Sequence, residues 1–216
     1  VEYTGRAAHA SVHPEDGINA ADALTVAQVA IGLLRQHLRE NDRVHGIVTL
    51  GGGAPNVVPA HTTGQWYARS ATLAELAELE PRVRACFEAG ALATGCELTY
   101  HPDARPYSEF RVDHGLAAVY RRNAEQLGRR FVEPGGPADR MLGSTDMANI
   151  SLALPSIHPM LDIDAQGSSN HQPEFAAHCV RPAADRAALD GAIAMAWTAI
   201  DTALDPDTSA RLRGGV

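Results

Sequence analysis

The sequence contains no lysine. All 18 basic residues are arginine, and 26 acidic residues give the chain a net charge of −8. Because no basic run occurs, neither a nucleic-acid groove nor an anionic membrane surface is an expected partner. No apolar stretch approaches the roughly 20 residues that a membrane-spanning helix needs, and no charged-then-apolar signal opens the chain. With 216 residues, 45% hydrophobic and 20% charged, the composition is that of a globular protein with one large or two small domains.

Cysteine is also scarce. Cys86, Cys96 and Cys179 are widely separated, odd in number and form no CxxC pair. This pattern argues against a disulfide framework or a zinc knuckle and favours reduced, mostly packed thiols, which fits a cytoplasmic protein. Histidine, by contrast, is abundant, with ten residues to account for.

Residues 1–108 read as alternating strands and helices. The elements expected in order are a strand within Val1–Ser11, a helix capped by Asn19 with an apolar stripe from Ala20 to Leu38, strands over Arg43–Leu50 and His61–Ala71, a helix from Thr72 to Gly95, and a strand over Cys96–Tyr100. This order predicts a split βαβ (ferredoxin-like) fold of the α+β class, with two helices on one face of a four-stranded antiparallel sheet. A long edge of such a sheet is commonly covered by a second copy.

Local signals mark the second of these helices. Thr72 and Glu75 form a capping box at its start, and Gly95 is a plausible C-terminal stop. Pro81 is expected to kink or divide the helix, because proline lacks the N–H group that the helix interior uses.

Residues 109–216 differ in kind. A helix is expected over Val112–Leu127, then a Pro/Gly loop over residues 133–137 and a short helix after Asp146. Leu152–Ile163 looks like a buried strand interrupted by two prolines. A long closing helix is marked by Leu189, Ile193, Ala196, Ile200 and Leu204. These elements do not make a closed α/β core, so this half is interpreted as part of something larger.

Three residues of the first half have both a functional and a structural interpretation. His9 stands among small residues in GRAAHASVHP, which leaves its imidazole open to approach, although a strand histidine is more often structural. Asn56 follows a triple glycine, which either lets the backbone approach a ligand closely or simply forms a hairpin loop. Arg69 lies near the end of a strand, where an exposed ion-pairing arginine is the ordinary alternative to a binding role.

The second half offers two polar candidates. Gly143, Ser144 and Thr145 precede a helix, where their hydroxyls and N–H groups suit a carboxylate or another anion, and helix capping explains the same residues equally well. His171 lies on a polar loop with Glu174 three residues later, and an imidazole in such a place can bind zinc. One histidine and one carboxylate do not complete a zinc site, which needs more ligands.

Seven stretches, taken together and in order, resemble one family over essentially the whole chain. They are GRAAHASVHPEDGINAADA, GGGAPNVVPA, WYARS, ALATGCELTY, GSTDMANIS, PSIHP and NHQPEF. They are similar to the second half of the co-catalytic zinc peptidases and amidohydrolases, which include aminoacylase, carboxypeptidase G and succinyl-diaminopimelate desuccinylase. Within that family, the branch of β-alanyl-lysine dipeptidase and aminobenzoyl-glutamate hydrolase is the most similar.

The resemblance implies a role for each candidate. Residues 1–108 would be a lid domain that forms a homodimer through its sheet edge and helices, and residues 109–216 the C-terminal portion of the catalytic domain. His9 would reach into the partner's active site and hold the oxyanion. The resemblance also assigns substrate contacts to Asn56, Arg69, Gly143, Ser144 and Thr145, and the last metal-ligand position to His171. His158, in PSIHP, has no assigned role.

The implied activity is metal-dependent hydrolysis of amide bonds in small peptides or N-acyl amino acids, through attack by a metal-bridged water. It implies two divalent metal ions, zinc first and cobalt or manganese as alternatives. The family's other metal ligands precede the lid, so the chain alone is expected to be metal-poor and inactive, as part of a protein about twice as long. The alternative is a non-catalytic dimerisation or ligand-binding module, because the split βαβ fold serves many such roles.

Overall fold

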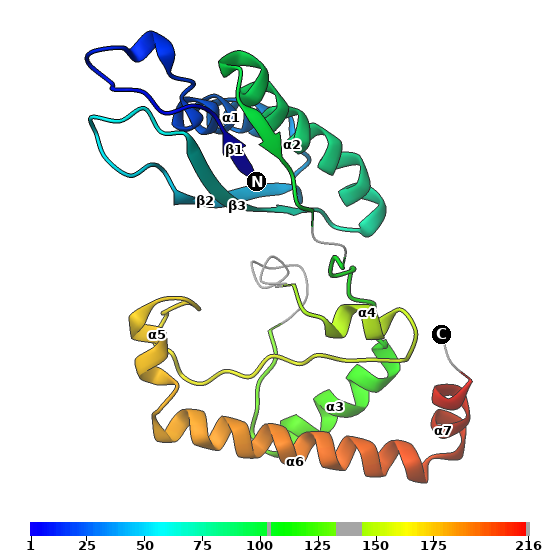
Figure 1. Ribbon diagram of the computed structural model, residues 1–216. Helices are drawn as coiled ribbons and strands as arrows, with labels where there is room; N and C mark the ends of the chain where they lie inside the picture. The colour runs from blue at the N-terminus through cyan, green and yellow to red at the C-terminus, as the bar shows by residue number, and fades with distance from the viewer. Residues whose placement is uncertain (103–104, 133–143, 215–216) are drawn as a thin grey trace. The chain divides into compact units, whose positions relative to one another are not determined.

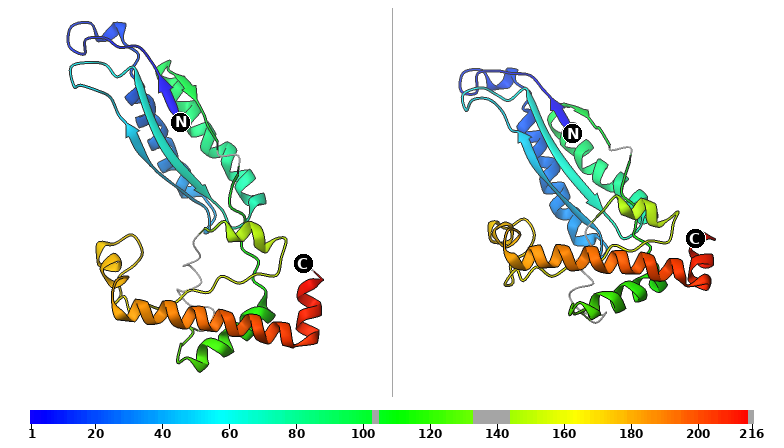
Figure 2. Two further views of the ribbon diagram at one scale, coloured as in Figure 1. Left: turned by 60° about the horizontal axis from the view of Figure 1, so that its bottom comes forward. Right: turned by 90° about the horizontal axis from the view of Figure 1, so that it is seen from below.

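The computed structural model describes residues 1–102, 105–132 and 144–214. The chain divides into two compact units, Val1–Pro106 and Tyr107–Val216 (Figures 1 and 2). Each candidate functional residue belongs to one unit or the other.

Unit 1 confirms the predicted βαββαβ order. Its four strands form one antiparallel sheet in the order β2-β3-β1-β4, and α1 and α2 cover one face. The elements are β1 (Glu2–Thr4), a 3-10 turn η1 (Pro14–Asp16), α1 (Ala20–Leu34), η2 (Arg35–His37), β2 (Arg43–Leu50), β3 (His61–Arg69), α2 (Leu73–Thr94) and β4 (Glu97–Thr99). The strand β2 therefore lies at an edge of the sheet.

The core of unit 1 lies between the sheet and its helices. Tyr3 of β1 is fully buried, and its hydroxyl donates a hydrogen bond to the carbonyl oxygen of Phe87 in α2 at 2.7 Å. The Phe87 ring meets Trp66 of β3 edge to face at 5.0 Å between ring centroids. Ile31 of α1 and Leu79 of α2 complete the most deeply buried group. Burial of these large apolar side chains supplies most of the driving force for the unit.

The predicted helix signals of unit 1 are largely confirmed. The Asn19 side chain accepts a hydrogen bond from the N–H of Ala21 at 2.9 Å, and Thr72 accepts one from Glu75 at 3.2 Å. Gly95 ends α2 in the left-handed conformation, with φ of 76°. Pro81 does not divide α2, which continues to Thr94. The lost hydrogen bond is outweighed by the burial of α2 side chains on both sides of Pro81.

The first strand is shorter than predicted. β1 ends at Thr4, and the chain beyond it leaves the sheet to form single bridges, Arg6 with Ile18 and His9 with Val57. An extended run of small residues reads as strand in the sequence, but its backbone partners here are two loops instead of a neighbouring strand.

Unit 2 consists of helices joined by long segments. Its helices are α3 (His114–Gln126), α4 (Met147–Ser151), α5 (Pro173–His178), α6 (Pro182–Leu204) and α7 (Pro206–Arg213). Tyr120 and Ala124 of α3 pack against Ala194 of α6. The amide of Asn123 adds hydrogen bonds to Thr198 at 3.3 Å and Asp201 at 3.0 Å. The predicted long closing helix is therefore confirmed as α6.

The predicted strand over Leu152–Ile163 is wrong. The segment begins in the turn that follows α4 and continues without strand structure, and its parallel bridge between Val112 and Ser156 is an isolated one. Pro155 and Pro159 each lack the N–H group that a ladder requires. The apolar pattern alone could not show whether a neighbouring strand would be there to pair with it.

The long helix α6 turns its small residues inward. The buried side is formed by Ala187, Gly191, Ala194, Thr198 and Thr202. Leu189, Ile200 and Leu204 are 60%, 54% and 76% exposed, respectively. The apolar stripe seen in the sequence is thus largely uncovered. No helix in the described ranges combines the length and apolar character needed to cross a membrane.

Candidate functional site

The structure brings His9 and Asn56 together at one end of unit 1. The segment that carries His9 runs antiparallel to the segment that follows Asn56. Three backbone hydrogen bonds join the two: Val58 N–H to Ala8 at 2.9 Å, Ala10 N–H to Asn56 at 3.0 Å and Gly5 N–H to Ala60 at 2.7 Å. Two residues more than forty positions apart are therefore held side by side by backbone pairing.

The His9 imidazole is exposed and oriented by its own loop. Its Nδ1 atom accepts a long hydrogen bond from the backbone N–H of Ser11 at 3.4 Å, and the Ser11 hydroxyl lies 3.3 Å from the same atom. A backbone N–H can only donate, so Nδ1 is the acceptor and the proton of the neutral ring lies on Nε2. The ring thus offers an N–H donor on its other nitrogen, as an oxyanion would require.

An apolar hollow lies beside this pair. Leu50 and Val57 line it and are 41% and 42% exposed. Gly52 also lines it, with φ of 135°, and a Cβ atom there would lie 2.9 Å from Cγ of Pro59. A side chain at residue 52 would disturb both the backbone and this contact, so Gly52 allows a close approach to Pro59.

Arg69 lies at the opposite end of β3. It pairs with Arg43 across the β2–β3 ladder, and its guanidinium stacks over the ring of Tyr67 at 5.7 Å. β3 begins at His61, so eight residue steps of about 3.3 Å separate the two ends by about 26 Å. Within one chain the structure does not bring Arg69 together with His9 and Asn56.

The residues before α4 are placed only in part. The Thr145 hydroxyl accepts a hydrogen bond from the N–H of Met147 at 3.3 Å, which agrees with the capping interpretation for this residue. Ser144 is exposed, and Gly143 lies outside the described residues. Their predicted contact with substrate stays a prediction.

His171 lies on a tightly turned loop just before α5. It is exposed and has φ of 70°, which is unusual for a residue other than glycine. Across the described parts of the chain, no group of three or more His, Cys, Asp or Glu side chains is arranged to hold a metal ion. His171 can supply one nitrogen ligand, but these residues do not complete a metal site. Within unit 2, α4 and α5 lie over different parts of α6 (Figure 1).

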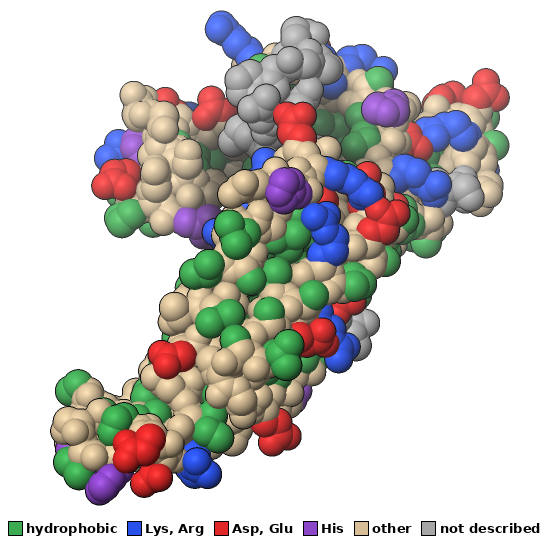
Figure 3. All heavy atoms as spheres, turned by 90° about the horizontal axis from the view of Figure 1, so that it is seen from above, with side chains coloured by type: hydrophobic (Ala, Val, Ile, Leu, Met, Phe, Trp, Pro, Cys, Tyr) green, Lys and Arg blue, Asp and Glu red, His purple; other side chains and the backbone are tan. Residues whose placement is uncertain are grey.

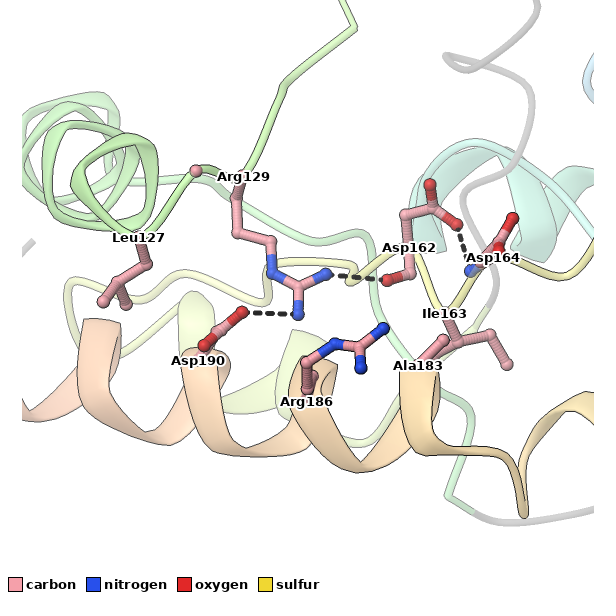
Figure 4. Close-up of a pocket in the computed structure, with 9 residues that line it drawn as sticks. Leu127, Arg129, Asp162, Ile163, Asp164, Ala183, Arg186 and Asp190 are labelled. Atoms are coloured by element: carbon pink, nitrogen blue, oxygen red, sulfur yellow. Dashed lines mark hydrogen bonds and ion pairs between the residues drawn. The ribbon is translucent and has the colours of Figure 1, made fainter.

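A largely buried arginine of unit 2 was not predicted from the sequence. Arg129 reaches from the end of α3 into a hollow between α6 and the segment at Asp162 (Figure 4). Its Nη2 atom lies 2.7 Å from Oδ2 of Asp190, and its Nη1 donates to the carbonyl oxygen of Asp162 at 3.0 Å. The next residue, Arg130, is exposed. Two adjacent arginines look alike in a sequence, so only the tertiary structure distinguishes them.

Known proteins of similar sequence are amide hydrolases. No protein-family model matches the chain. The chain is 34% identical to Xaa-Arg dipeptidase of Mus musculus over 206 residues, which are 95% of this chain and 48% of that protein. Over 93 residues it is also 34% identical to one subunit of the p-aminobenzoyl-glutamate hydrolase of Escherichia coli (strain K12), covering 43% of this chain and 19% of that protein.

The chain is homologous to these hydrolases. It spans about half the length of the Xaa-Arg dipeptidase it matches. Among solved structures, that of AtUAH in complex with (S)-hydroxyglycine has a TM-score of 0.67 and 16% identity, covering 95% of this chain and 46% of that one. This likeness shows that the two chains share a fold over the matched region. The resemblance inferred from the seven motifs is therefore confirmed at the level of homology and fold.

Proposed function

We propose that this chain belongs to a metal-dependent hydrolase of amide bonds in small peptides or N-acyl amino acids. The observation that carries the proposal is the position of His9, whose bridge to Val57 holds it beside Asn56. The imidazole is exposed there, and the hydrogen bond from Ser11 to Nδ1 leaves the proton of a neutral ring on Nε2. The names of the homologous dipeptidase and hydrolase support the same reaction class. The dipeptidase is about twice as long as the matched region, and the activity is proposed for a protein of that length.

In the proposed reaction, water attacks the amide carbon and the carbonyl oxygen becomes negatively charged. His9 donates its Nε2 hydrogen to that oxygen, and such a donor, set in place before the reaction, contributes roughly 3 kcal/mol to transition-state stability. Asn56 and Arg69 bind the amide and carboxylate ends of the substrate. Gly143, Ser144 and Thr145 line the substrate pocket.

We propose that the protein binds two divalent metal ions and that His171 is a ligand of one of them. Zinc is the first choice, with cobalt or manganese as alternatives. Its imidazole is exposed, which leaves it open to a metal. The described residues supply no complete ligand set, so the 216-residue chain alone is expected to be inactive. A cytoplasmic location also stays a prediction, supported by three free cysteines.

A second copy of the chain is the proposed partner. The edge strand β2 exposes Ile47 and Val48 at 63% and 40%. The neighbouring helix α1 exposes Val29 and Leu33, and its only charged residue is Asp22. Apolar side chains appear at the surface of unit 1 between its charged groups (Figure 3). An eight-residue edge strand with apolar side chains is suited to pairing with another β2 strand.

Such pairing would also assemble the site. The Leu50 end of β2 leads to Asn56, and the Arg43 end pairs with Arg69. Two β2 strands that pair antiparallel place the Leu50 end of one beside the Arg43 end of the other. His9 and Asn56 of one chain would then approach the partner's Arg69, which accounts for their separation within a single chain.

The experiment compares His9→Ala with His13→Ala in the full-length gene product, purified with zinc, cobalt or manganese. His13 lies on the same exposed loop, and Nδ1 of its ring lies 3.4 Å from Oε1 of Glu15. We expect His9→Ala to lower kcat on a panel of dipeptides and N-acyl amino acids by about 100-fold, with the bound metal and the dimer retained. His13→Ala should keep native turnover.

Two results would contradict the proposal in different ways. Equal turnover in both variants and the native protein would make His9 a structural residue. No cleavage of any substrate by the native protein, with no bound metal, would favour the non-catalytic dimerisation or ligand-binding module.

A further inference from the structure

We propose that Arg129 is a positioning residue that anchors the segment leading to His171. The inference rests on the proposed function, because it assigns His171 a place in the active site. It begins from the hollow of Figure 4, which lies entirely within unit 2.

The Arg129 side chain binds two residues from distant parts of the sequence. It follows Gly128, whose φ of 81° turns the chain sharply after α3. The side chain is only 20% exposed, and its guanidinium binds the carboxylate of Asp190 on α6 and the backbone carbonyl of Asp162. Its Nε atom is buried without a hydrogen-bond partner among the described residues. Burying a cation with an unsatisfied N–H costs free energy of folding. The contacts with Asp190 and Asp162 offset part of that cost.

A second contact fixes the same segment beside the first. Gly191 follows Asp190 on α6, and a Cβ atom there would lie 2.4 Å from Cδ1 of Leu161. The absence of a side chain at residue 191 lets Leu161 lie directly on the helix. Adjacent residues of α6 therefore hold Leu161 and, through Arg129, Asp162.

From this anchor the chain reaches His171 through consecutive tight turns. Asp164, Gln166 and His171 have φ of 59°, 50° and 70°, in the left-handed region that residues other than glycine rarely adopt. Short local bonds hold the turns. They are Asp164 N–H to Asp162 Oδ1 at 2.8 Å, Gln166 Nε2 to Asp164 Oδ1 at 2.6 Å, and Ser169 N–H to Gln172 Oε1 at 2.7 Å. A loop bonded in this way transmits the position of Asp162 to His171.

The geometry also explains why the residue is arginine. A guanidinium presents several N–H groups in a fixed plane and can bind a carboxylate and a carbonyl at once, whereas a lysine ammonium is a single point charge on a flexible stem. Arg129→Lys should therefore keep the attraction to Asp190 and lose the simultaneous hold on Asp162.

Arg122 provides a matched control. It also joins α3 to α6, with Nη2 3.0 Å from Oδ2 of Asp201, but it does not contact the segment at Asp162. The test uses the full-length gene product with Arg129→Gln, Arg129→Lys and Arg122→Gln. We expect Arg129→Gln to speed backbone hydrogen exchange in residues 162–172 and to lower kcat about 10-fold or more, with KM changed by less than about threefold.

The other variants make the expectation specific. Arg129→Lys should give intermediate exchange and intermediate kcat, and Arg122→Gln should leave both at native values. If Arg129→Gln fails to fold, hydrogen exchange in residues 162–172 and kcat of the Arg129→Lys variant test the inference instead. Native exchange in residues 162–172 of an Arg129 variant, or equal effects in Arg122→Gln, would overturn the inference.

The same experiment distinguishes failure of the proposed function from failure of the Arg129 inference. Suppose that the native full-length product hydrolyses no substrate while hydrogen exchange still differs between the Arg129 and Arg122 variants. In that case Arg129 anchors the loop, but the proposed hydrolase activity is wrong. If native hydrolysis is found and the contrast is absent, the hydrolase stands and the anchoring role is wrong.

Discussion

Tyr3 shows how a single buried side chain joins two elements of unit 1. Its hydroxyl is the only polar group of a fully buried ring, and it donates to the carbonyl oxygen of Phe87 at 2.7 Å. Tyr3→Phe keeps the ring and removes this bond, while the Phe87 carbonyl keeps its place in the hydrogen-bond pattern of α2. We expect the free energy of unfolding to fall by about 1 kcal/mol in urea denaturation. Tyr67→Phe, at a ring that is 66% exposed, is the control and should change little.

The same hydroxyl makes unit 1 sensitive to alkali. Burial raises the pKa of Tyr3 above its usual value of 10.0, and burial also raises the pKa values of Tyr100 and, in unit 2, Tyr120. As pH rises past 10.0, the unfolded chain loses protons that the folded chain retains, so stability falls. Denaturation between about pH 8 and pH 11 should show this loss, and a smaller one in Tyr3→Phe. An equal loss in both proteins would mean that Tyr3 does not contribute.

Asp113 performs two tasks at the start of α3. Its Oδ1 accepts a hydrogen bond from the N–H of Leu116 at 2.8 Å, and its carboxylate binds Arg211 of α7 with contacts of 2.6 and 3.0 Å. Arg211 lowers the pKa of Asp113. The stability that this carboxylate provides is therefore present above the usual Asp pKa and is lost as pH falls through the lowered value.

Two substitutions separate these tasks. Asp113→Asn keeps a side-chain oxygen for the cap and removes the charge that holds α7. Asp113→Ala removes both and should cost about 1 to 2 kcal/mol of unfolding free energy. Hydrogen exchange should show faster exchange in α7 for both variants and faster exchange at the start of α3 only for Asp113→Ala. Fraying of α3 in Asp113→Asn would contradict this assignment.

The helices predicted from the sequence agree with the structure more closely than the predicted strands do. Asn19, Thr72 and Gly95 act on backbone groups within a few residues, so their roles can be read locally. The strands predicted over Val1–Ser11 and Leu152–Ile163 required partners from elsewhere. The first is cut short at Thr4 and the second does not form. A strand exists only where a distant segment supplies its hydrogen bonds.

For the chain as a whole, the exposed edge of β2 predicts association. Ile47→Glu places a charge on the strand proposed to pair with a second copy, and Leu92→Glu places one on α2, where the side chain is 88% exposed. In sedimentation experiments on the full-length gene product, we expect Ile47→Glu to shift dimer to monomer and Leu92→Glu to leave the dimer intact. Because His9 is proposed to act on the partner, the monomer should also lose hydrolysis. An active monomer would place the whole site within one chain.

The uncovered stripe of α6 has a different consequence. Leu189, Ile200 and Leu204 are exposed because the helix packs its small residues against α3. Unit 2 thus presents an apolar surface without having completed its own core.

Some properties of this protein follow from the order of its residues alone. The βαββαβ pattern, the helix caps and the similarity to amide hydrolases depend on spacing and on neighbours along the chain. Others depended on which distant segments meet. Three features result from contacts between residues far apart in the sequence: the position of His9 beside Asn56, the separation of Arg69 from both, and the burial of Arg129 while Arg130 is exposed. Local patterns record backbone preferences, whereas a site also requires hydrogen-bond partners and burial that only the folded chain supplies.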